Sequence, residues 1–117
     1  MLDNGIIISK DYGRCQCMLN GLDFSNKNLK KALELTINEQ INHNELANWC
    51  YRYVNDVYFN DIEISSLDVI GKELILDIDA QWELYLSNNY TLSELQTIDY
   101  HTVKMPIEWL HKWYNAI

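Results

Sequence analysis

The spacing of apolar residues predicts a mainly α-helical chain of about four to five helices. The first helix is expected over about residues 26–39, where Ser25 or Asn26 can cap the free amides of the first turn. Five residues recur there at helical spacing: Leu29, Ala32, Leu33, Thr36 and Ile37. This pattern predicts one buried face on the first helix.

The second predicted helix has the most regular apolar stripe. We expect Asn42 or Asn44 as its N-cap and Glu45 in its first turn, where a carboxylate suits the helix dipole. Its stripe has six members: Leu46, Trp49, Cys50, Tyr53, Val54 and Val57. His43 flanks the start of this helix, so we expect its side chain to be exposed.

A third helix is predicted after a connection over residues 58–64. It should start after Ser65 or Ser66, because apolar residues continue at helical spacing over residues 67–82. The run 74–79 also fits a strand, and we favour a helix because the longer spacing passes through it. The expected inner residues are Leu67, Ile70, Leu74 and Ile78.

Two shorter helices are predicted towards the C-terminal end. Thr91-Leu92-Ser93-Glu94 has the form of a capping box, in which the Thr hydroxyl and the Glu carboxylate satisfy exposed amides reciprocally. Pro106 suits the first position of the last helix, where no amide hydrogen is needed. Its inner face should contain Ile107, Leu110, Trp113 and Ile117.

Residues 5–19 have strand character. The run 6–8 is β-branched, apolar residues alternate over 15–19, and residues 11–13 suit a turn between them. A short N-terminal β-hairpin and a loose segment both fit this pattern. No repeat or linker divides the chain, so residues 1–117 are expected to form a single domain.

Charge limits the classes of partner. The formal net charge is −8 and the pI is about 4.6. Direct binding to nucleic acid or to an anionic membrane requires Lys and Arg, so both are disfavoured, whereas a basic protein partner is compatible. The acidic residues are concentrated, because residues 53–99 contain ten of them and a single basic residue, Lys72.

The cysteines and the apolar runs point to a cytoplasmic protein. The three cysteines are odd in number and lack the spacing of a disulfide framework, which indicates reduced thiols. No basic region precedes the short apolar run 6–8, and no stretch has the length of a membrane span.

No catalytic, cofactor or metal site is expected. The histidines His43, His101 and His111 lack metal-ligand spacing, and Cys15-x-Cys17 is a weak zinc signal by itself. Cys50 falls on an apolar stripe and should be an inert core thiol. The four glycines are too dispersed to cradle a phosphate, and we expect no enzymatic activity.

Carboxylates and aromatic residues are the remaining candidates for function. Asp77 and Asp79 point in different directions on a helix and share a face on a strand, and we interpret them as part of a solvated face. Trp49 and Trp113 are expected in the core. Aromatic residues in the acidic stretch either anchor a partner or complete the core: Tyr58, Trp82, Tyr85 and Tyr90.

The segment from Asn42 to Asp56, Asn-His-Asn-Glu-Leu-Ala-Asn-Trp-Cys-Tyr-Arg-Tyr-Val-Asn-Asp, resembles a Glu-x-x-x-Trp-Ala helix of small bacterial immunity proteins. Glu45 and Trp49 take the motif positions, and Cys50 stands where Ala is more usual. In that family an acidic connection, a Leu-containing helix, a Tyr-Leu-x-x-x-Asp/Glu motif and a Trp-Leu helix follow. The counterparts here are Leu67 to Asp77, Tyr90 to Glu94, and Trp109-Leu110. The resemblance covers about residues 42–117.

This resemblance implies an immunity protein, such as the CdiI-like proteins of contact-dependent growth inhibition. Such a protein binds and neutralises a cognate toxin domain, often a basic nuclease, in the bacterial cytosol, without turnover. We expect the partner surface to contain Asp56, Tyr58, Asp61, Glu63, Asp68, Asp77, Asp79 and Trp82. Two alternatives stay open: an acidic nucleic-acid mimic that inhibits a DNA-binding protein, and a small enzyme with an unrecognised site.

Overall fold

The computed structural model describes residues 19, 21–58 and 66–117, with the backbone alone at residues 57 and 58. Five α-helices lie in these residues: α2 (Asn26–Ile37), α3 (His43–Tyr53), α4 (Val69–Asn89), α5 (Leu92–Thr97) and α6 (Ile107–Ala116). A π-helix, η1 (Val54–Tyr58), extends α3, and a 3-10 helix, η2 (Tyr100–Thr102), precedes α6. The described part contains no strand, so the mainly α-helical prediction is confirmed.

Two expected segments fall almost wholly outside this part of the chain. The possible hairpin over residues 5–19 is outside it except for Leu19, which is buried. The expected connection over residues 58–64 is outside it except for the backbone of Tyr58.

Side-chain caps determine where the first helices begin, as the sequence predicts. The Ser25 hydroxyl accepts the Asn28 amide at the start of α2, at 3.1 Å. At the start of α3, Asn42 Oδ1 accepts the Glu45 amide at 2.9 Å, and Glu45 Oε1 accepts the Asn42 amide at 3.4 Å. Each cap satisfies amides that have no partner within the helix.

Side-chain caps also begin α4 and α5, and two predicted helix starts need correction: α4 begins after Asp68 and not after Ser65 or Ser66, and Pro106 precedes α6. The capping box of α5 is confirmed, because the Thr91 hydroxyl accepts the Glu94 amide and the Glu94 carboxylate accepts the Thr91 amide. α4 begins after Asp68, whose carboxylate accepts the Gly71 amide at 2.8 Å. Pro106 is the N-cap of α6 and not its first helical residue, because its ψ of 134° is extended.

α4 continues through residues 74–79 to Asn89, so the strand alternative for that run is wrong. The periodicity was ambiguous because apolar residues are adjacent there. In the helix, Ile75 and Ile78 are fully buried, whereas Leu74 and Leu76 are half-buried. Apolar residues on several sides of a helix blur its period.

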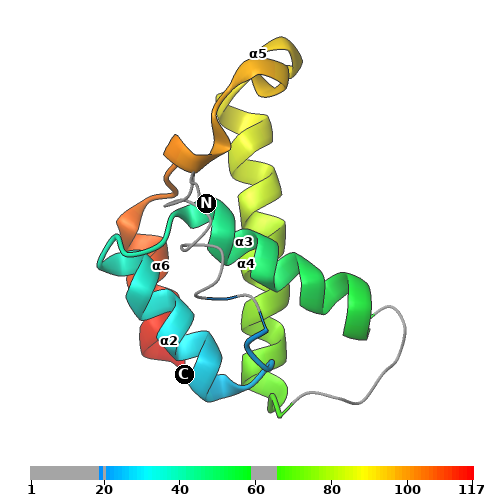
Figure 1. Cartoon of the computed structure of the whole chain (residues 1–117), viewed down its shortest axis with the longest axis vertical. Coiled ribbons are helices and arrows are strands. Elements are labelled where there is room, and N and C mark those ends of the chain that lie inside the picture. The colour runs from blue at the N-terminus through cyan, green and yellow to red at the C-terminus, as the bar shows by residue number, and fades with distance from the viewer. Residues whose placement is uncertain (1–18, 20, 59–65) are drawn as a thin grey trace, which may run out of the picture.

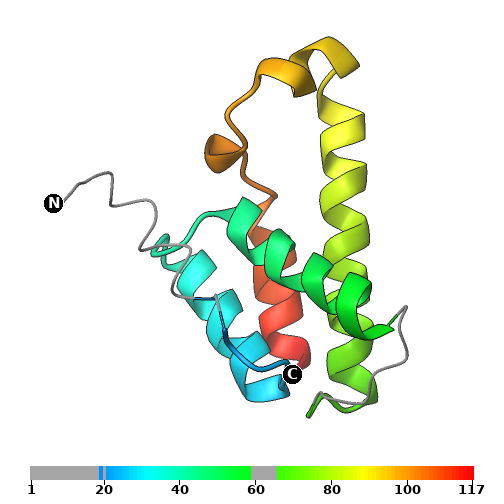
Figure 2. The ribbon, with the colours of Figure 1, turned by 45° about the vertical axis from the view of Figure 1, so that its right-hand side comes forward.

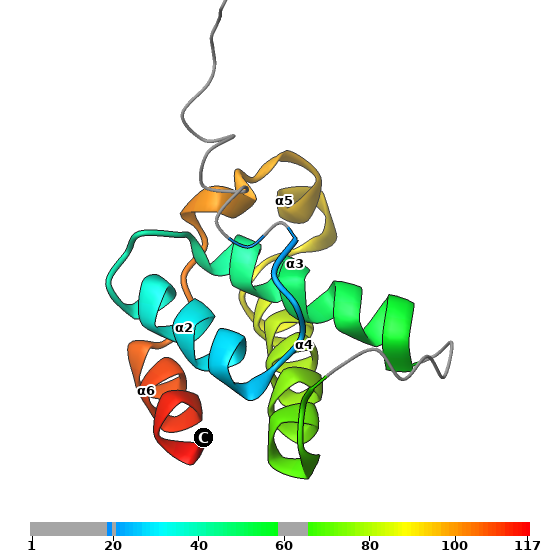
Figure 3. The same cartoon turned by 60° about the horizontal axis from the view of Figure 1, so that its bottom comes forward.

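The helices are arranged in two pairs. α3 crosses α4, and α2 lies along α6 (Figure 1). Figure 3 shows the same two pairs from below, with α2 over α6. The starts of α2 and α4 are joined, because the Ser66 amide donates to the Phe24 carbonyl at 2.8 Å. α5 lies beyond the crossing, at the C-terminal end of α4.

The core lies where α2, α3, α4 and α6 meet. Trp49 of α3 is fully buried, its ring is 5.1 Å from that of Phe24, and its indole N–H donates to the Leu22 carbonyl at 3.4 Å. Other fully buried members are Leu29, Leu33, Leu46, Ile75, Ile78 and Leu110. The prediction that Trp49 and Trp113 belong to the core is confirmed.

Three predictions of exposure or burial are wrong. His43 is only 5% exposed, and its Nδ1 accepts the Met105 amide at 2.8 Å. Ile70 and Ile107, expected on inner faces, are 52% and 45% exposed. The buried faces of α4 and α6 are therefore rotated away from the first apolar residue of each helix.

Candidate functional site

α4 has two contrasting faces. One is buried against the core and consists of Gly71, Ile75, Ile78, Trp82 and Leu86. The opposite face, here named the α4 outer face, consists of Val69, Ile70, Glu73, Asp77, Ala80 and Leu84, all of them exposed. These residues share a face because, from Ile70 onwards, successive members lie three or four positions apart, close to one helical turn, and Val69 lies one turn before Glu73.

The α4 outer face exposes three large apolar side chains. Val69 is 70% exposed, Ile70 52% and Leu84 51%. A single exposed apolar residue is ordinary, but several on one face form a patch that favours contact with another molecule. From Val69 to Leu84 the patch extends for about 22 Å at the helical rise. Figure 2 shows α4 at one edge of the ribbon, with α2 and α6 on its other side.

Carboxylates accompany these apolar residues. Glu73 and Asp77 are exposed between Ile70 and Leu84 on the same face. α4 as a whole contains four acidic residues and one basic residue, Lys72. The face therefore combines apolar contact area with a negative field, which favours a basic protein surface over a neutral one.

A pocket of about 210 Å³ between α4 and α6 adjoins this face. Its lining consists of Asp77, Gln81, Trp109, Lys112 and Trp113. The Trp113 indole N–H donates to Asp77 Oδ2 at 2.8 Å and joins the two helices. Asp77 thus belongs both to the α4 outer face and to the pocket, as an exposed residue with one oriented oxygen.

The predicted partner-binding residues are dispersed. Asp77 lies on the α4 outer face, and Asp68 caps α4 at the end of that face. The Asp68 pKa is held below its usual value by hydrogen bonds from the Gly71 amide and the Asn26 side chain. Asp68 therefore remains ionised, as a cap and as an exposed negative charge.

Asp79 and Trp82 point towards the core side of α4. Trp82 is 5% exposed, so it belongs to the core and not to the expected partner surface. Asp79 is half-buried, and burial followed by the nearby Glu83 raises its pKa. Burial also raises the pKa of the Cys50 thiol, with a further contribution from Asp79, which supports an inert core thiol.

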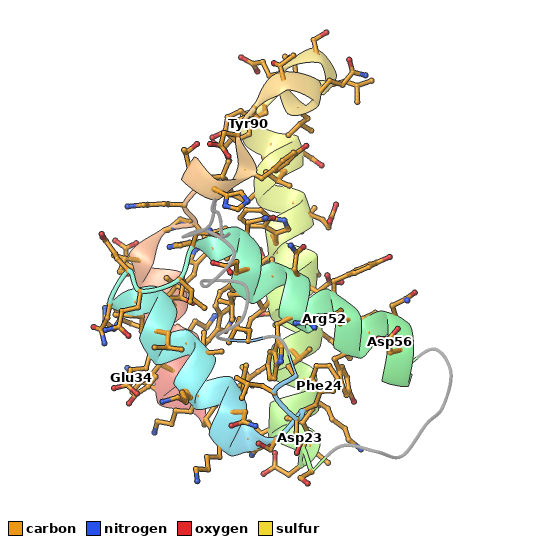
Figure 4. The ribbon with its side chains drawn as sticks, in the orientation of Figure 1. Asp23, Phe24, Glu34, Arg52, Asp56 and Tyr90 are labelled. Carbon is orange, nitrogen blue, oxygen red and sulfur yellow. The ribbon has the colours of Figure 1, made fainter. Side chains whose placement is uncertain are left out.

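Asp56 lies in a different place, at the end of the α3–η1 helix. It is exposed and lines a pocket of about 210 Å³ with Asp23, Phe24 and Arg52 (Figure 4). This pocket lies beside the start of α2, away from Asp77. The Tyr58 side chain and all of Asp61 and Glu63 lie outside the described residues.

The described residues bring together no group of three His, Cys, Asp or Glu side chains that could hold a metal ion. Cys50 is fully buried, His43 binds the Met105 amide, and His101 Nδ1 is 3.1 Å from the Asn42 side-chain nitrogen. Each of these side chains is engaged by the fold. Among the helices of the described part, none has the length and apolar character needed to cross a membrane.

Comparisons with protein-family models, with curated proteins and with solved structures gave no match for this chain. The candidate site is therefore defined by its own geometry.

Sequence analysis missed most of this site. Val69, Glu73 and Leu84 were not selected, and Ile70 was assigned to the core. One signal was present: Val69, Glu73, Asp77 and Leu84 repeat at helical spacing and form a second stripe beside the buried one. The place of Trp109 and Lys112 in the pocket could not be predicted, because it depends on the packing of α6 on α4, which no local sequence pattern indicates.

Proposed function

We propose that this chain is an immunity-type protein that binds and neutralises a basic bacterial toxin domain, of the nuclease type, in the cytosol. One observation carries the proposal: the α4 outer face exposes Val69, Ile70 and Leu84 together with the carboxylates of Glu73 and Asp77. In this proposal the protein acts by stoichiometric binding and has no catalytic step.

The physical chemistry of this face suits capture of a basic protein. Exposed apolar side chains gain free energy when a partner covers them, at about 25 cal/mol per Å². Carboxylates beside them speed encounter with a positive surface and disfavour acidic partners. A dense nucleic-acid mimic would require more carboxylates than the α4 outer face provides, because only Glu73 and Asp77 are acidic among its six residues.

The motifs that resemble immunity proteins have structural roles in this fold. Glu45 completes the cap of α3, Trp49 fills the core, and Leu110 of the Trp-Leu pair is fully buried. These structural roles say nothing about which surface binds a partner. The assignment of the binding surface to the α4 outer face therefore rests on exposure and charge.

The test begins with the full chain, tagged and expressed in a bacterium that encodes it. A bound polypeptide would be identified by mass spectrometry and then expressed alone. We expect a basic polypeptide in equal stoichiometry that arrests growth by itself and loses this effect when the chain is co-expressed. A partner that leaves growth unaffected, or arrest that co-expression does not relieve, would refute the immunity function.

Variants then test the surface with the purified pair. Ile70→Asp removes apolar contact and should weaken binding at least about tenfold, within the range for an interface anchor. Glu73→Lys should lower the association rate about threefold to tenfold and reduce its salt dependence. Glu34→Lys, an equal charge change at an exposed position of α2, is the control and should have a smaller effect. Equal effects of Glu73→Lys and Glu34→Lys would show that net charge matters and this face does not.

A further inference from the structure

The pocket between α4 and α6 offers a more specific contact than the α4 outer face beside it. We propose that this pocket binds the guanidinium group of an arginine side chain presented by the partner. The inference rests on the proposed function for the identity of the partner. The chemistry of the pocket can be tested without that partner.

The carboxylate of Asp77 is held in place for such a ligand. Its Oδ2 accepts the Trp113 indole N–H at 2.8 Å, which restrains the orientation of the carboxylate. Within the described residues, Oδ1 has no hydrogen-bond partner. A guanidinium N–H can therefore donate to Oδ1 without breaking a contact of the fold, and hydrogen bonds between two charged groups are stronger than neutral ones.

An aromatic wall stands beside this carboxylate. The half-buried Trp109 ring lies 5.9 Å from that of Tyr85, at 84°, and 6.3 Å from that of Trp113, at 63°. Two edge-on contacts hold the Trp109 ring in a defined orientation. A planar cation placed over an indole face is attracted by the negative face of the ring, and Trp is the best of the aromatic residues for this purpose.

α6 already presents another ring to a cation. Lys30 Nζ of α2 lies 4.7 Å from the centre of the Tyr114 ring. Tyr114 and the pocket tryptophans lie on the same ten-residue helix. A cation over an aromatic ring is therefore a contact that this helix makes within the molecule.

Arginine fits the pocket better than lysine does. Its flat guanidinium can stack on Trp109 and donate to Asp77 Oδ1 in one pose, whereas an ammonium is a compact point charge with stronger hydration. Gln81 also lines the pocket, and its side-chain amide can accept a hydrogen bond. The pocket volume of about 210 Å³ admits one side-chain end and excludes a larger folded segment.

The role of Lys112 distinguishes binding of a cation in this pocket from binding of an anion or a zwitterion. Its ammonium is exposed and lines the same pocket, so it repels a bound guanidinium. Removal of Lys112 should therefore strengthen binding of a cation. If the pocket instead binds an anion or a zwitterion, Lys112 is a ligand and its removal should weaken binding.

The experiment uses NMR of the full chain, with the Trp113 indole N–H resonance as the probe. The chain would be titrated with N-acetyl-arginine methylamide and with the uncharged citrulline analogue. We expect a saturable shift with arginine, with Kd on the order of tens of millimolar, as for one exposed ion pair together with one cation–π contact. Binding of the citrulline analogue should be at least about fivefold weaker, because it lacks the charge.

Three variants complete the test. Asp77→Asn keeps an acceptor for the Trp113 indole and should remove the preference for arginine over citrulline. Lys112→Ala should tighten arginine binding about twofold to threefold, and Lys31→Ala, an exposed lysine on α2, should leave it unchanged. Equal shifts with both probes, or weaker arginine binding in Lys112→Ala, would overturn the proposal.

Binding experiments with the purified partner distinguish the arginine-pocket proposal from the proposed immunity function. Trp109→Ala should weaken the complex at least about tenfold if an arginine anchor occupies the pocket. A complex that forms and protects cells but is insensitive to Trp109→Ala would refute the anchor pocket and leave the immunity function standing. Arginine binding in a chain with no toxin partner would refute the immunity function and leave the chemistry of the pocket standing.

Discussion

His43 provides the sharpest prediction about stability. Its ring is 5% exposed, and Nδ1 accepts the Met105 amide at 2.8 Å, so the folded protein requires an unprotonated Nδ1. Burial, followed by the charge of Lys104, lowers the His43 pKa to about 4, against the partial opposition of Glu39. The unfolded chain binds this proton with a pKa of about 6.5.

The direction of the pH effect on stability follows from the linkage between proton binding and folding. Because the folded pKa lies below the unfolded one, the contribution of His43 is complete above about pH 6.5 and is lost as pH falls towards 4. At pH 5 the proton favours the unfolded state by a factor of about thirty, which is about 2 kcal/mol in the free energy of unfolding. Below pH 4 the loss levels off at about 3.5 kcal/mol.

The assay is urea unfolding at pH 7.5 and pH 5.0, on the parent chain and on His43→Asn. The Asn side chain places an oxygen near the position of Nδ1 and does not titrate in this range. We expect the parent chain to lose about 2 kcal/mol more than the variant does between the two pH values. The difference between the two proteins cancels the other titrating groups, Glu45 included.

His111→Asn is the matched control, because His111 is exposed on α6. It should retain the pH dependence of the parent chain. If His43→Asn and the parent lost stability equally, within about 0.5 kcal/mol, the buried neutral imidazole would not be the source of the acid sensitivity.

Three other predictions follow from packing. A methyl group at Gly71 would collide with Asn26 Oδ1, so Gly71→Ala should lower the free energy of unfolding by about 1–3 kcal/mol despite the better helix propensity of Ala. In a double-mutant cycle, Asn26→Ala should reduce that loss because it removes the colliding atom. On α6, Leu110→Ala should lower it by about 2–5 kcal/mol, and Ile107→Ala, at 45% exposure, by less than about 1 kcal/mol, both by urea unfolding. Iodoacetamide should modify Cys50 at least about a hundredfold more slowly in native buffer than in urea, by peptide mass spectrometry, and rapid native labelling would contradict its burial.

Local signals predicted the helix starts well because capping is a short-range interaction. Ser25, Asn42 and Thr91 each bind an amide three positions ahead, so the residues that form the cap are visible together in the sequence. Asp68 was missed as the cap of α4, although it stands three residues before Gly71. The sequence also offers Ser65 and Ser66 as local caps, and Asp68 was expected on the acidic partner surface.

Long-range contacts could not be predicted in this way. The buried His43 accepts a hydrogen bond from the Met105 amide, 62 positions away, and the Trp113 indole donates to the Asp77 carboxylate, 36 positions away. In the sequence, a histidine beside a helix cap has the pattern of an exposed residue. Its burial depends on where the chain before α6 passes, which is a property of the packed helices.

The candidate site illustrates the same limit in α4. Both faces of this helix contain large apolar residues, so its pattern identifies a helix without identifying the buried side. Packing with the neighbouring helices decides the matter, because the core buries Ile75, Ile78 and Trp82 and leaves Val69, Ile70 and Leu84 exposed. An ordinary surface helix would have polar residues at the exposed positions 69, 70 and 84. Packing within the described residues therefore does not account for their apolar character, and in the proposed function a partner protein covers these side chains.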